Sequence, residues 1–490
     1  MSPNILIIPF TLAFIFSVAA RKEKTIQISS LFFSLLGGLA VIFYAAPFVF
    51  HFQNKWIDSW FMMDSFSALL AILISIIYIF SIIISLRYIG HEYEEKIITF
   101  SQYKMYFSLF QAFVLCMLMV VLTNNSLVLW LTLEGTTLFS TFLVGLYLKK
   151  TSMEAAWKYM ILCSTGISLG LLGILLLSYG AHIGGVADGN IFSLSYLMEN
   201  SQLIPENIIK LAFIFIFIGF GTKVGLVPMH TWLPDAHSKA PSPISAIFSA
   251  VLLNVALYAI LRFKFIADSA FLDSSWTNSL FLIFGFLSVI LSALMMLIQS
   301  NYKRMLAYSS IEHMGIILFS IGLSPLGAAA AVMHMIGHTF AKSALFFGAG
   351  EILIQWKTTK VPKIKNMLHY SRYTSMLFMA GIVAIIAIPP SALFVSEYSM
   401  FAQSIALHPI VSIFFFIALS IIAYAMLAVT IEMIFSVDES GKRIDMKKER
   451  WNITHSIIAI ELALVVFLAW WFTTLGAGRI INHIVETFIY

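Results

Sequence analysis

Ionisable side chains interrupt several long apolar segments of this sequence. A charged group at the centre of a bilayer costs a few kcal/mol or more, so residues of this kind are candidates for function rather than for packing. Six of them lie deep within apolar runs: Glu134, Lys223, His334, His338, Lys342 and Glu397. A second set lies in the same or neighbouring runs and carries less weight: His230, Asn254, Glu312, His313 and Glu351.

Three of these residues share one segment, AVMHMIGHTFAKSALFFGAGEIL. His334, His338 and Lys342 are spaced i, i+4 and i+8, which places them on one face of a helix. Histidine titrates near neutral pH, and burial brings a lysine toward that range, so such a stripe is suited to a hydrated proton relay. The alternative is that the two histidines only bridge neighbouring helices through hydrogen bonds.

Glu134 and Lys223 are opposite charges in two different apolar segments at similar depth. One interpretation is a buried ion pair that fixes the register of two helices. The other is a switchable pair, in which displacing one charge changes the proton affinity of the other. The sequence leaves both open.

Other patterns do not predict a metal or phosphate site. GFGTKVG lies in an apolar helix with no strand before it, so helix packing explains its glycines. His230, Asp235 and His237 in HTWLPDAHSKAPSP fit a polar turn between two apolar segments. The two cysteines, Cys116 and Cys163, provide neither a disulfide framework nor a thiolate set for zinc or iron–sulfur clusters. We therefore expect no cofactor in this chain.

The composition places these residues in a membrane protein. Of the 490 residues, 60% are hydrophobic and 11% charged, whereas soluble domains carry about a quarter charged residues. Fourteen apolar runs are long enough to cross about 30 Å of hydrocarbon. They lie near 3–20, 26–50, 62–86, 105–122, 126–148, 159–180, 208–228, 243–263, 278–298, 305–323, 325–354, 375–402, 409–435 and 455–475. We expect an all-α polytopic protein without an extramembrane domain.

The distribution of basic residues supports this count. If the loops alternate between two sides, 22 of the 29 lysines and arginines fall on one side, including Lys442, Arg443, Lys447 and Lys448. Five fall on the other side, and Lys223 and Lys342 lie within the spans. Because basic loops stay in the cytoplasm, we expect a cell (inner) membrane protein with both termini on the periplasmic or extracellular side.

Prolines predict two broken helices. Pro228 follows Lys223 and ends the seventh span, and Pro389 with Pro390 interrupts the twelfth span before Glu397. Broken helices in corresponding halves of a transporter mark its ion pathway. The breaks are five spans apart, which predicts two inverted five-helix repeats, helices 4–8 and 9–13. The expected parts are an N-terminal segment 1–104, repeats 105–265 and 278–435, and a C-terminal part 436–490.

The segment GTKVGLVPMHTWLPDAHSKAPSPISAIFSAVLLNVALYAILRF resembles the signature of the antiporter-like membrane subunits found in respiratory complex I, Mrp-type antiporters and energy-converting hydrogenases. NYKRMLAYSSIEHMG, HTFAKSALFFGAGEI and the expected span count are similar to the same family. The IEHMG and PPSALFVSE segments are most similar to the F-type subunit of hydrogenase-4.

The resemblance implies roles for residues already selected. A glutamate in the fifth helix (Glu134) would pair with a lysine in the broken seventh helix (Lys223). A central lysine or histidine (Lys342 with His338) would then pass protons to Glu397. Two positions depart from some relatives: Asn254 replaces a lysine of the eighth helix, and Glu397 replaces a terminal lysine.

The resulting hypothesis is a proton-translocating subunit without redox chemistry of its own, in a redox-driven complex such as a membrane-bound [NiFe] hydrogenase. Its partners would be other membrane subunits and, indirectly, peripheral [NiFe] and iron–sulfur subunits, with no nucleic acid. The alternatives are a complex I subunit, an Mrp-type Na⁺/H⁺ antiporter subunit, or an assembly scaffold whose charges only set helix register.

Overall fold

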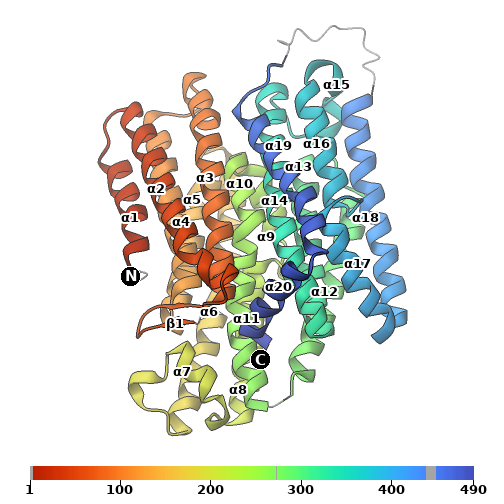
Figure 1. Cartoon of the computed structure of the whole chain (residues 1–490). Helices are drawn as coiled ribbons and strands as arrows, with labels where there is room; N and C mark the ends of the chain where they lie inside the picture. The colour runs from red at the N-terminus through yellow and green to blue at the C-terminus, as the bar shows by residue number, and fades with distance from the viewer. Residues whose placement is uncertain (1–3, 54, 272, 437–448, 490) are drawn as a thin grey trace. The chain divides into compact units, whose positions relative to one another are not determined.

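The computed structural model describes residues 4–53, 55–271, 273–436 and 449–489, and these are almost entirely helical (Figure 1). Lys442, Arg443, Lys447 and Lys448, counted above with the basic loops, lie outside the described residues. The chain forms two compact units, Met1–Trp232 with Val251–Phe281 and Arg479–Tyr490, and Leu233–Ala250 with Leu282–Gly478. The four-part division and the inverted repeats expected from the sequence stay predictions.

The first unit is a bundle of long helices with small elements in its connections. The helices are α1 (Asn4–Ala19), α2 (Glu23–Phe50), α3 (Ser65–Glu94), α4 (Phe100–Leu122), α5 (Ser126–Val144), α6 (Lys150–Ile183), α8 (Glu206–Val224) and α11 (Leu253–Phe271). The connections contain the antiparallel strands β1 (Trp56–Ile57) and β2 (Met62–Met63), with α7 (Leu194–Glu199) and the short helices η1 (Asp188–Asn190) and η2 (Ser201–Leu203). α6 packs against α5 and α8, which brings Glu134, Lys223 and the polar residues of α6 together.

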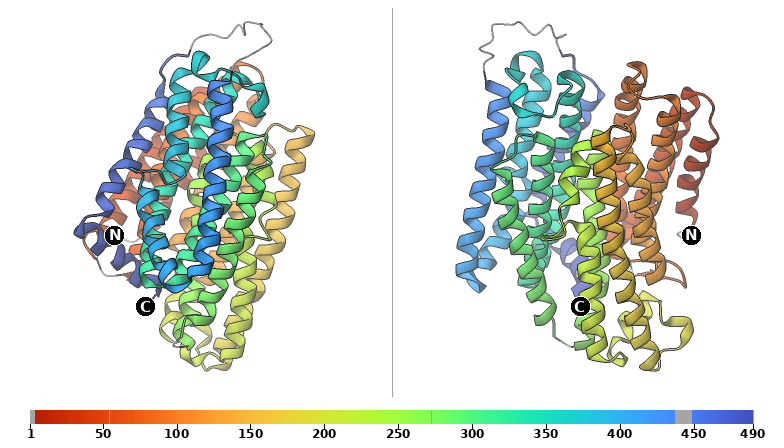
Figure 2. Two further views of the ribbon diagram at one scale, coloured as in Figure 1. Left: turned by 90° about the vertical axis from the view of Figure 1, so that its right-hand side faces the viewer. Right: turned by 180° about the vertical axis from the view of Figure 1, so that it is seen from behind.

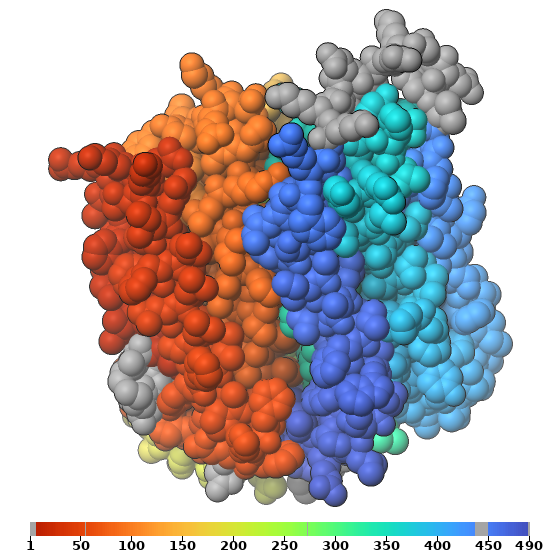
Figure 3. Space-filling view, turned by 45° about the horizontal axis from the view of Figure 1, so that its top comes forward, coloured from red at the N-terminus to blue at the C-terminus, as the bar shows by residue number. Residues whose placement is uncertain are grey.

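The second unit is built around α14 (Pro325–Trp356), which contacts five of its neighbours. These are α10 (Ser242–Ile247), α13 (Tyr302–Leu323), α16 (Arg372–Ile385), α17 (Ala392–Leu407) and α19 (Ile453–Phe472). The helices of this unit from α13 to α19 are coloured from green to blue in Figure 2. The unit also contains the short helices η4 (Val361–Lys363) and α15 (Met367–Tyr370) and the long helix α18 (Pro409–Phe435). α18 is light blue in Figure 3. Most of α9 (Trp232–Lys239) and of α12 (Ser275–Met296) belongs to the same unit. The π-helical turn η3 (Phe248–Leu252) joins α10 to α11, and α20 (Leu475–Ile489) ends the chain.

Each of the fourteen expected spans falls mainly on helix. Eleven of the described helical segments are long and apolar enough to cross a membrane. The other three expected spans are α1, which has 16 residues, α14, which carries several ionisable residues, and the pair α16 and α17, which the helix break divides. The all-α polytopic class is confirmed, and the exact count of fourteen stays a prediction.

The first predicted helix break lies directly after Lys223. α8 ends at Val224 because Gly225 adopts a left-handed conformation (φ 82°), which a glycine tolerates without strain. Beyond the break, the indole Nε1 of Trp232 donates a hydrogen bond of 2.8 Å to the carbonyl of Thr222. The Thr222 carbonyl also accepts from the backbone N–H of Gly225 (3.2 Å), so Trp232 provides a second donor that fixes the turn beside Lys223.

The second break separates α16 from α17 at Pro389 and Pro390, as predicted. Ser391 connects the two helix ends. Its hydroxyl donates to the carbonyl of Ala384 (2.7 Å) and accepts from the backbone N–H of Leu393 (3.1 Å). Glu397 therefore lies in the second turn of a capped helix that begins within the span.

Glu449 caps the other end of α16. It accepts hydrogen bonds from the first-turn N–H groups of Tyr373 (2.7 Å) and Thr374 (3.2 Å), and a further bond joins it to His455 Nε2 (3.1 Å). Burial alone would raise the pKa of Glu449, but the hydrogen bonds from His455 and Thr374 hold it below its ordinary value. A carboxylate at a helix N-terminus stabilises the helix, so the half of the broken span that precedes Glu397 is anchored.

Close packing between α6 and α8 holds Lys223 against its neighbours. A Cβ added at Gly219 would lie 2.4 Å from the backbone N of Gly170 and 2.6 Å from the carbonyl O of Gly166. Small residues at such a crossing let two membrane helices approach closely. Gly219 precedes Lys223 by one turn, so this contact positions the lysine.

Replacing Gly219 by alanine is expected to destabilise the protein. The new methyl group meets backbone atoms of α6 that cannot rotate away, and overpacking of this kind costs about 1–3 kcal/mol. The measurement is the thermal unfolding midpoint of purified protein in detergent. Gly189→Ala is the matched control, because nothing lies within 4 Å of the Cβ it would add. Equal midpoints for the two variants would contradict the packing argument.

Candidate functional site

Lys223 is fully buried in the first unit and is held by two hydroxyl groups. Its Nζ donates to Thr137 Oγ1 of α5 (2.8 Å) and to Tyr159 Oη of α6 (2.6 Å). The ammonium group also lies 4.8 Å from the centre of the Tyr159 ring, a cation–π contact. Ser140 Oγ lies 2.7 Å from the same Tyr159 Oη, so the lysine joins a polar cluster that two helices provide.

Glu134 does not form a direct ion pair with Lys223. Its Oε1 instead accepts a hydrogen bond from Ser164 of α6 (2.5 Å), and its buried Oε2 has no hydrogen-bond partner in the described part of the chain. Thr137, which binds Lys223, follows Glu134 by one turn of α5. The two charged residues thus contact hydroxyl groups of the same pair of helices, α5 and α6.

The second unit contains the stripe expected on α14. His334, His338 and Lys342 are all buried and face α13, where Leu306 and His313 contact Lys342 and His334 respectively. The polar row extends over eight residues of α14, about 12 Å at 1.5 Å per residue. The prediction that these three residues share one helix face is confirmed.

One end of the row is a chain of hydrogen bonds. His313 Nδ1 lies 2.9 Å from His334 Nε2, and His334 Nδ1 lies 3.0 Å from Ser396 Oγ of α17. Ser396 donates its single hydroxyl proton to the carbonyl of Leu393 (2.9 Å), so its oxygen accepts from His334 Nδ1–H.

This assignment fixes the histidine tautomers. Because His334 Nδ1 is a donor, its Nε2 accepts from His313 Nδ1–H, and His313 Nε2 is then the acceptor in the neutral ring. That nitrogen lies 3.6 Å from Glu312 Oε2. In these tautomers the two hydrogen bonds run in one direction, from His313 to His334 and from His334 to Ser396.

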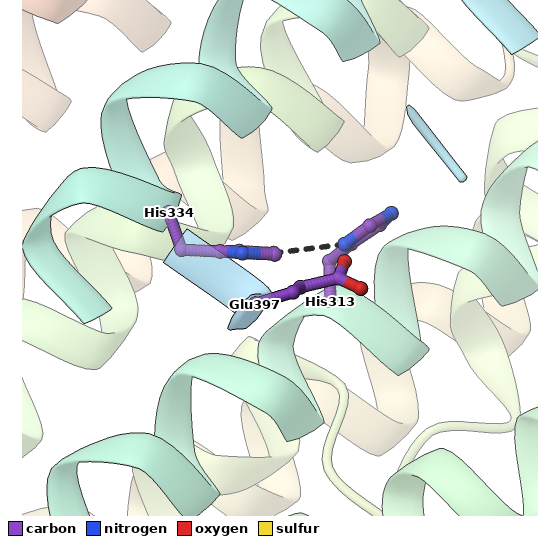
Figure 4. Close-up of side chains that lie close together, drawn as sticks. All are labelled: His313, His334 and Glu397. Atoms are coloured by element: carbon purple, nitrogen blue, oxygen red, sulfur yellow. Dashed lines mark hydrogen bonds between the residues drawn. The ribbon is translucent and has the colours of Figure 1, made fainter. Parts of the chain in front are cut away.

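Glu397 lies beside this chain, as Figure 4 shows with His313 and His334. A carboxylate oxygen of Glu397 and one nitrogen of each imidazole all lie within 4.8 Å of one another. Glu397 is half-buried, whereas both histidines are buried. The three side chains come from α17, α13 and α14, so their meeting depends on the packing of three helices.

Lys342 lies at the other end of the row. Its Nζ donates to the backbone carbonyl of Leu306 (2.9 Å), and among the described residues no carboxylate lies within ion-pair distance of it. Between Lys342 and His334 lies His338, whose two ring nitrogens are buried without a hydrogen-bond partner in the described ranges. Its ring centre lies 5.1 Å from that of His313. Polar atoms of this kind in the interior are expected to bind water or a ligand.

The three remaining candidates lie on other elements or near a helix end. His230 is buried in the turn after α8, and Asn254 is buried in the first turn of α11. Glu351, near the end of α14, accepts a hydrogen bond from Asn452 Nδ2 (3.1 Å). Asp235 of the HTWLPDAHSKAPSP segment forms an ion pair with Arg304. The prediction of a polar turn is wrong for most of this segment, because Trp232–Lys239 forms α9 and the ring of His237 is fully buried, where it stacks on Phe346.

Several residues of the clusters escaped the sequence analysis. Thr137 and Tyr159 bind Lys223, Ser164 binds Glu134, and Ser396 binds His334. Uncharged hydroxyl groups are common in membrane helices, so their presence in the sequence does not indicate a functional site. Only Ser396 could have been selected, because it directly precedes Glu397. Glu312 and His313 received low weight, yet His313 is the central member of the hydrogen-bonded row.

Comparisons with known proteins agree with this architecture. A family profile described as NADH:quinone oxidoreductase/Mrp antiporter, TM, matches residues 123–423, which include both clusters. The hydrogenase-4 component F homolog of Methylacidiphilum infernorum (isolate V4) is 36% identical over 388 residues, covering 78% of each chain. Hydrogenase-4 component B of Escherichia coli (strain K12) is 29% identical over 401 residues, 79% of this chain and 56% of that longer protein.

A solved structure shares the fold along nearly the whole chain. It belongs to the membrane-bound sulfane sulfur reductase, an archaeal respiratory membrane complex, with a TM-score of 0.84, 21% identity and 99% of each chain covered. The profile match spans more than half of this chain, and the component F homolog exceeds 30% identity over most of it. The chain is therefore a multi-pass membrane protein that belongs to the NADH:quinone oxidoreductase/Mrp antiporter transmembrane family.

Proposed function

We propose that this chain is a proton-translocating subunit of a membrane-bound hydrogenase-type complex. The observation that carries the proposal is the row of titratable groups between α13, α14 and α17. Glu312, His313 and His334 are consecutive members whose facing atoms are 3.6 and 2.9 Å apart, inside an apolar bundle. Such a row costs stability and is otherwise unnecessary for helix packing, so moving protons is the function that accounts for it.

The same groups favour protons over sodium as the transported ion. Hard cations require several oxygen ligands, whereas the row on α13 and α14 consists mainly of imidazoles and one amine. The other cluster offers hydroxyl oxygens, but those of Thr137 and Tyr159 already accept hydrogen bonds from Lys223. The clusters do contain the carboxylates of Glu134, Glu312 and Glu397, but no two of them lie in one group of candidate ligands among the described residues. A lysine or imidazole gains and loses a proton directly, but it provides no oxygen ligand for a sodium ion.

The driving reaction is proposed to take place outside this chain. Both hydrogenase-4 relatives are components of multi-subunit enzymes by name, which favours further membrane subunits and a peripheral [NiFe] and iron–sulfur partner. We assign no redox centre to this chain. From the distribution of basic residues in the loops, we propose that the chain lies in the cell membrane with both termini on the periplasmic or extracellular side.

The Mrp-type Na⁺/H⁺ antiporter subunit is the second candidate, because the family description includes such antiporters. Both readings place the same residues in the ion pathway. They differ in the partner and in the ion that moves.

Purification from native membranes in mild detergent, with mass spectrometry of the accompanying proteins, tests the assignment. Recovery of nickel–iron hydrogenase subunits is the expected result. Recovery of NADH-oxidising subunits would instead assign the chain to a complex I. Recovery of antiporter-type membrane proteins without a redox partner would favour sodium exchange. The last outcome would overturn the redox-driven proposal.

A further inference from the structure

The cluster in Figure 4 has the composition of a transition-metal site. His313, His334 and Glu397 each offer one ligand atom, and these atoms lie within 4.8 Å of one another. The three residues come from three different helices, so no spacing in the sequence indicates the site. Each helix is fixed by its own contacts with α14 or α13, which holds the ligands in place without the metal.

A fourth ligand is available beside this group. His338 follows His334 by one turn of α14, and both its ring nitrogens are buried without hydrogen-bond partners in the part of the chain that the structure describes. Its ring centre lies 5.1 Å from that of His313 and 6.4 Å from that of His334. A buried imidazole with unused nitrogens, one helical turn from His334 and beside His313, is an observation independent of the geometry of the three ligand atoms.

We propose that His313, His334, His338 and Glu397 bind one Zn²⁺ ion and that the bound ion blocks the proton row. Imidazole and carboxylate ligands in fourfold coordination are typical of zinc, whereas calcium and magnesium prefer oxygen ligands. The blocking step rests on the proposed function, but the binding of zinc does not.

The two histidines that face each other need little movement to bind zinc. His313 Nδ1 and His334 Nε2 are 2.9 Å apart. In a tetrahedral site with Zn–N bonds of about 2.0–2.1 Å, neighbouring nitrogens lie about 3.3 Å apart, so the pair opens by a few tenths of an ångström. Glu397 is half-buried, so its side of the cluster is the accessible one.

Zinc and the relayed proton compete for the same atoms. The hydrogen between His313 Nδ1 and His334 Nε2 is the one that a relay passes on, and a metal bound to both nitrogens replaces it. The displaced hydrogen moves to Nε2 of His313, which has no hydrogen-bond partner in the described part of the chain, so both imidazoles stay neutral. They cannot pass a proton to each other while the metal stays bound. Inhibition should be reversed by a chelator.

The first measurement is zinc binding to the purified complex by equilibrium dialysis, with X-ray absorption at the zinc edge. We expect one Zn²⁺ with nitrogen and oxygen ligands that is lost in the double variant His313→Gln, His334→Gln. Removing a ligand should lower the affinity by about 100-fold or more, since even outer-shell changes cost 10–100-fold. Glu397→Gln provides a second variant with a neutral side chain of the same shape.

The control is His182→Asn, which removes an exposed histidine paired with Asp188 at 2.9 Å on the surface of the first unit. Zinc that is lost in the control and retained in the double variant would overturn the site. The second measurement is turnover-driven proton translocation in vesicles with and without zinc. Site-bound zinc without inhibition would overturn the blocking step, while inhibition of the wild-type complex that rises with zinc occupancy of the site and is reversed by EDTA would support it.

Discussion

Replacing Lys223 by methionine is expected to abolish proton translocation while the complex still assembles. The ammonium group donates to Thr137 and Tyr159, and the methionine side chain fills a similar volume without donating or releasing a proton. Removal of a buried charge together with its desolvation cost often leaves stability unchanged or improved, so folding should survive. A positioned proton-transfer group contributes about 100-fold or more to rate, which sets the expected loss. The assay is turnover-driven acidification of inverted membrane vesicles.

Lys210→Met is the matched control on the same helix. Lys210 is partly exposed and pairs with Glu206 one turn away, an interaction worth about 0–1 kcal/mol, so this variant should pump normally. The scaffold alternative makes a different prediction for the neutral pair Glu134→Gln, Lys223→Met. If the two charges only set helix register, that double variant keeps full coupled activity, which would rule out the relay.

Replacing His334 by alanine should interrupt the row in the second unit. His334 is the sole described link between His313 and Ser396, with contacts of 2.9 and 3.0 Å. A cavity the size of an imidazole leaves no group to accept the proton from His313, so pumping should fall by about 100-fold or more. The same vesicle assay applies, with electron transfer measured in parallel.

Two further variants help to interpret this result: His334→Gln tests for a structural role, and His369→Ala is the control. Glutamine keeps a hydrogen-bonding side chain but cannot be protonated at neutral pH, so a structural bridge would be rescued by it and a relay would not. His369 is an exposed residue of α15, and its replacement should have no effect. Full pumping in His334→Gln would show that the histidine only bridges α14 and α17.

The span pattern and helix breaks followed from the sequence because the bilayer imposes simple rules. Apolar length identified the helices, and Pro228 with Pro389 and Pro390 marked both interruptions correctly. The elements outside the spans were missed. α20 is a helix of 15 residues after the last expected span, and β1, β2 and α7 lie in connections without an apolar pattern.

The candidate site was only partly predictable. Charge in an apolar run identified Glu134, Lys223, His334, His338, Lys342 and Glu397, since few other reasons place such groups there. Which of them meet could not be read from the sequence, because it depends on how α13, α14 and α17 pack. The hydroxyl partners Thr137, Tyr159 and Ser396 carry no charge, so burial alone does not distinguish them from packing residues.

The most direct test of the central claim is the number of protons moved per electron by the purified complex in sealed proteoliposomes. Wild-type complex should move protons in proportion to electron transfer, and complex with Lys223→Met should move none through this subunit while electrons still flow. An unchanged ratio of protons to electrons in the variant would contradict the claim that this chain carries protons across the membrane.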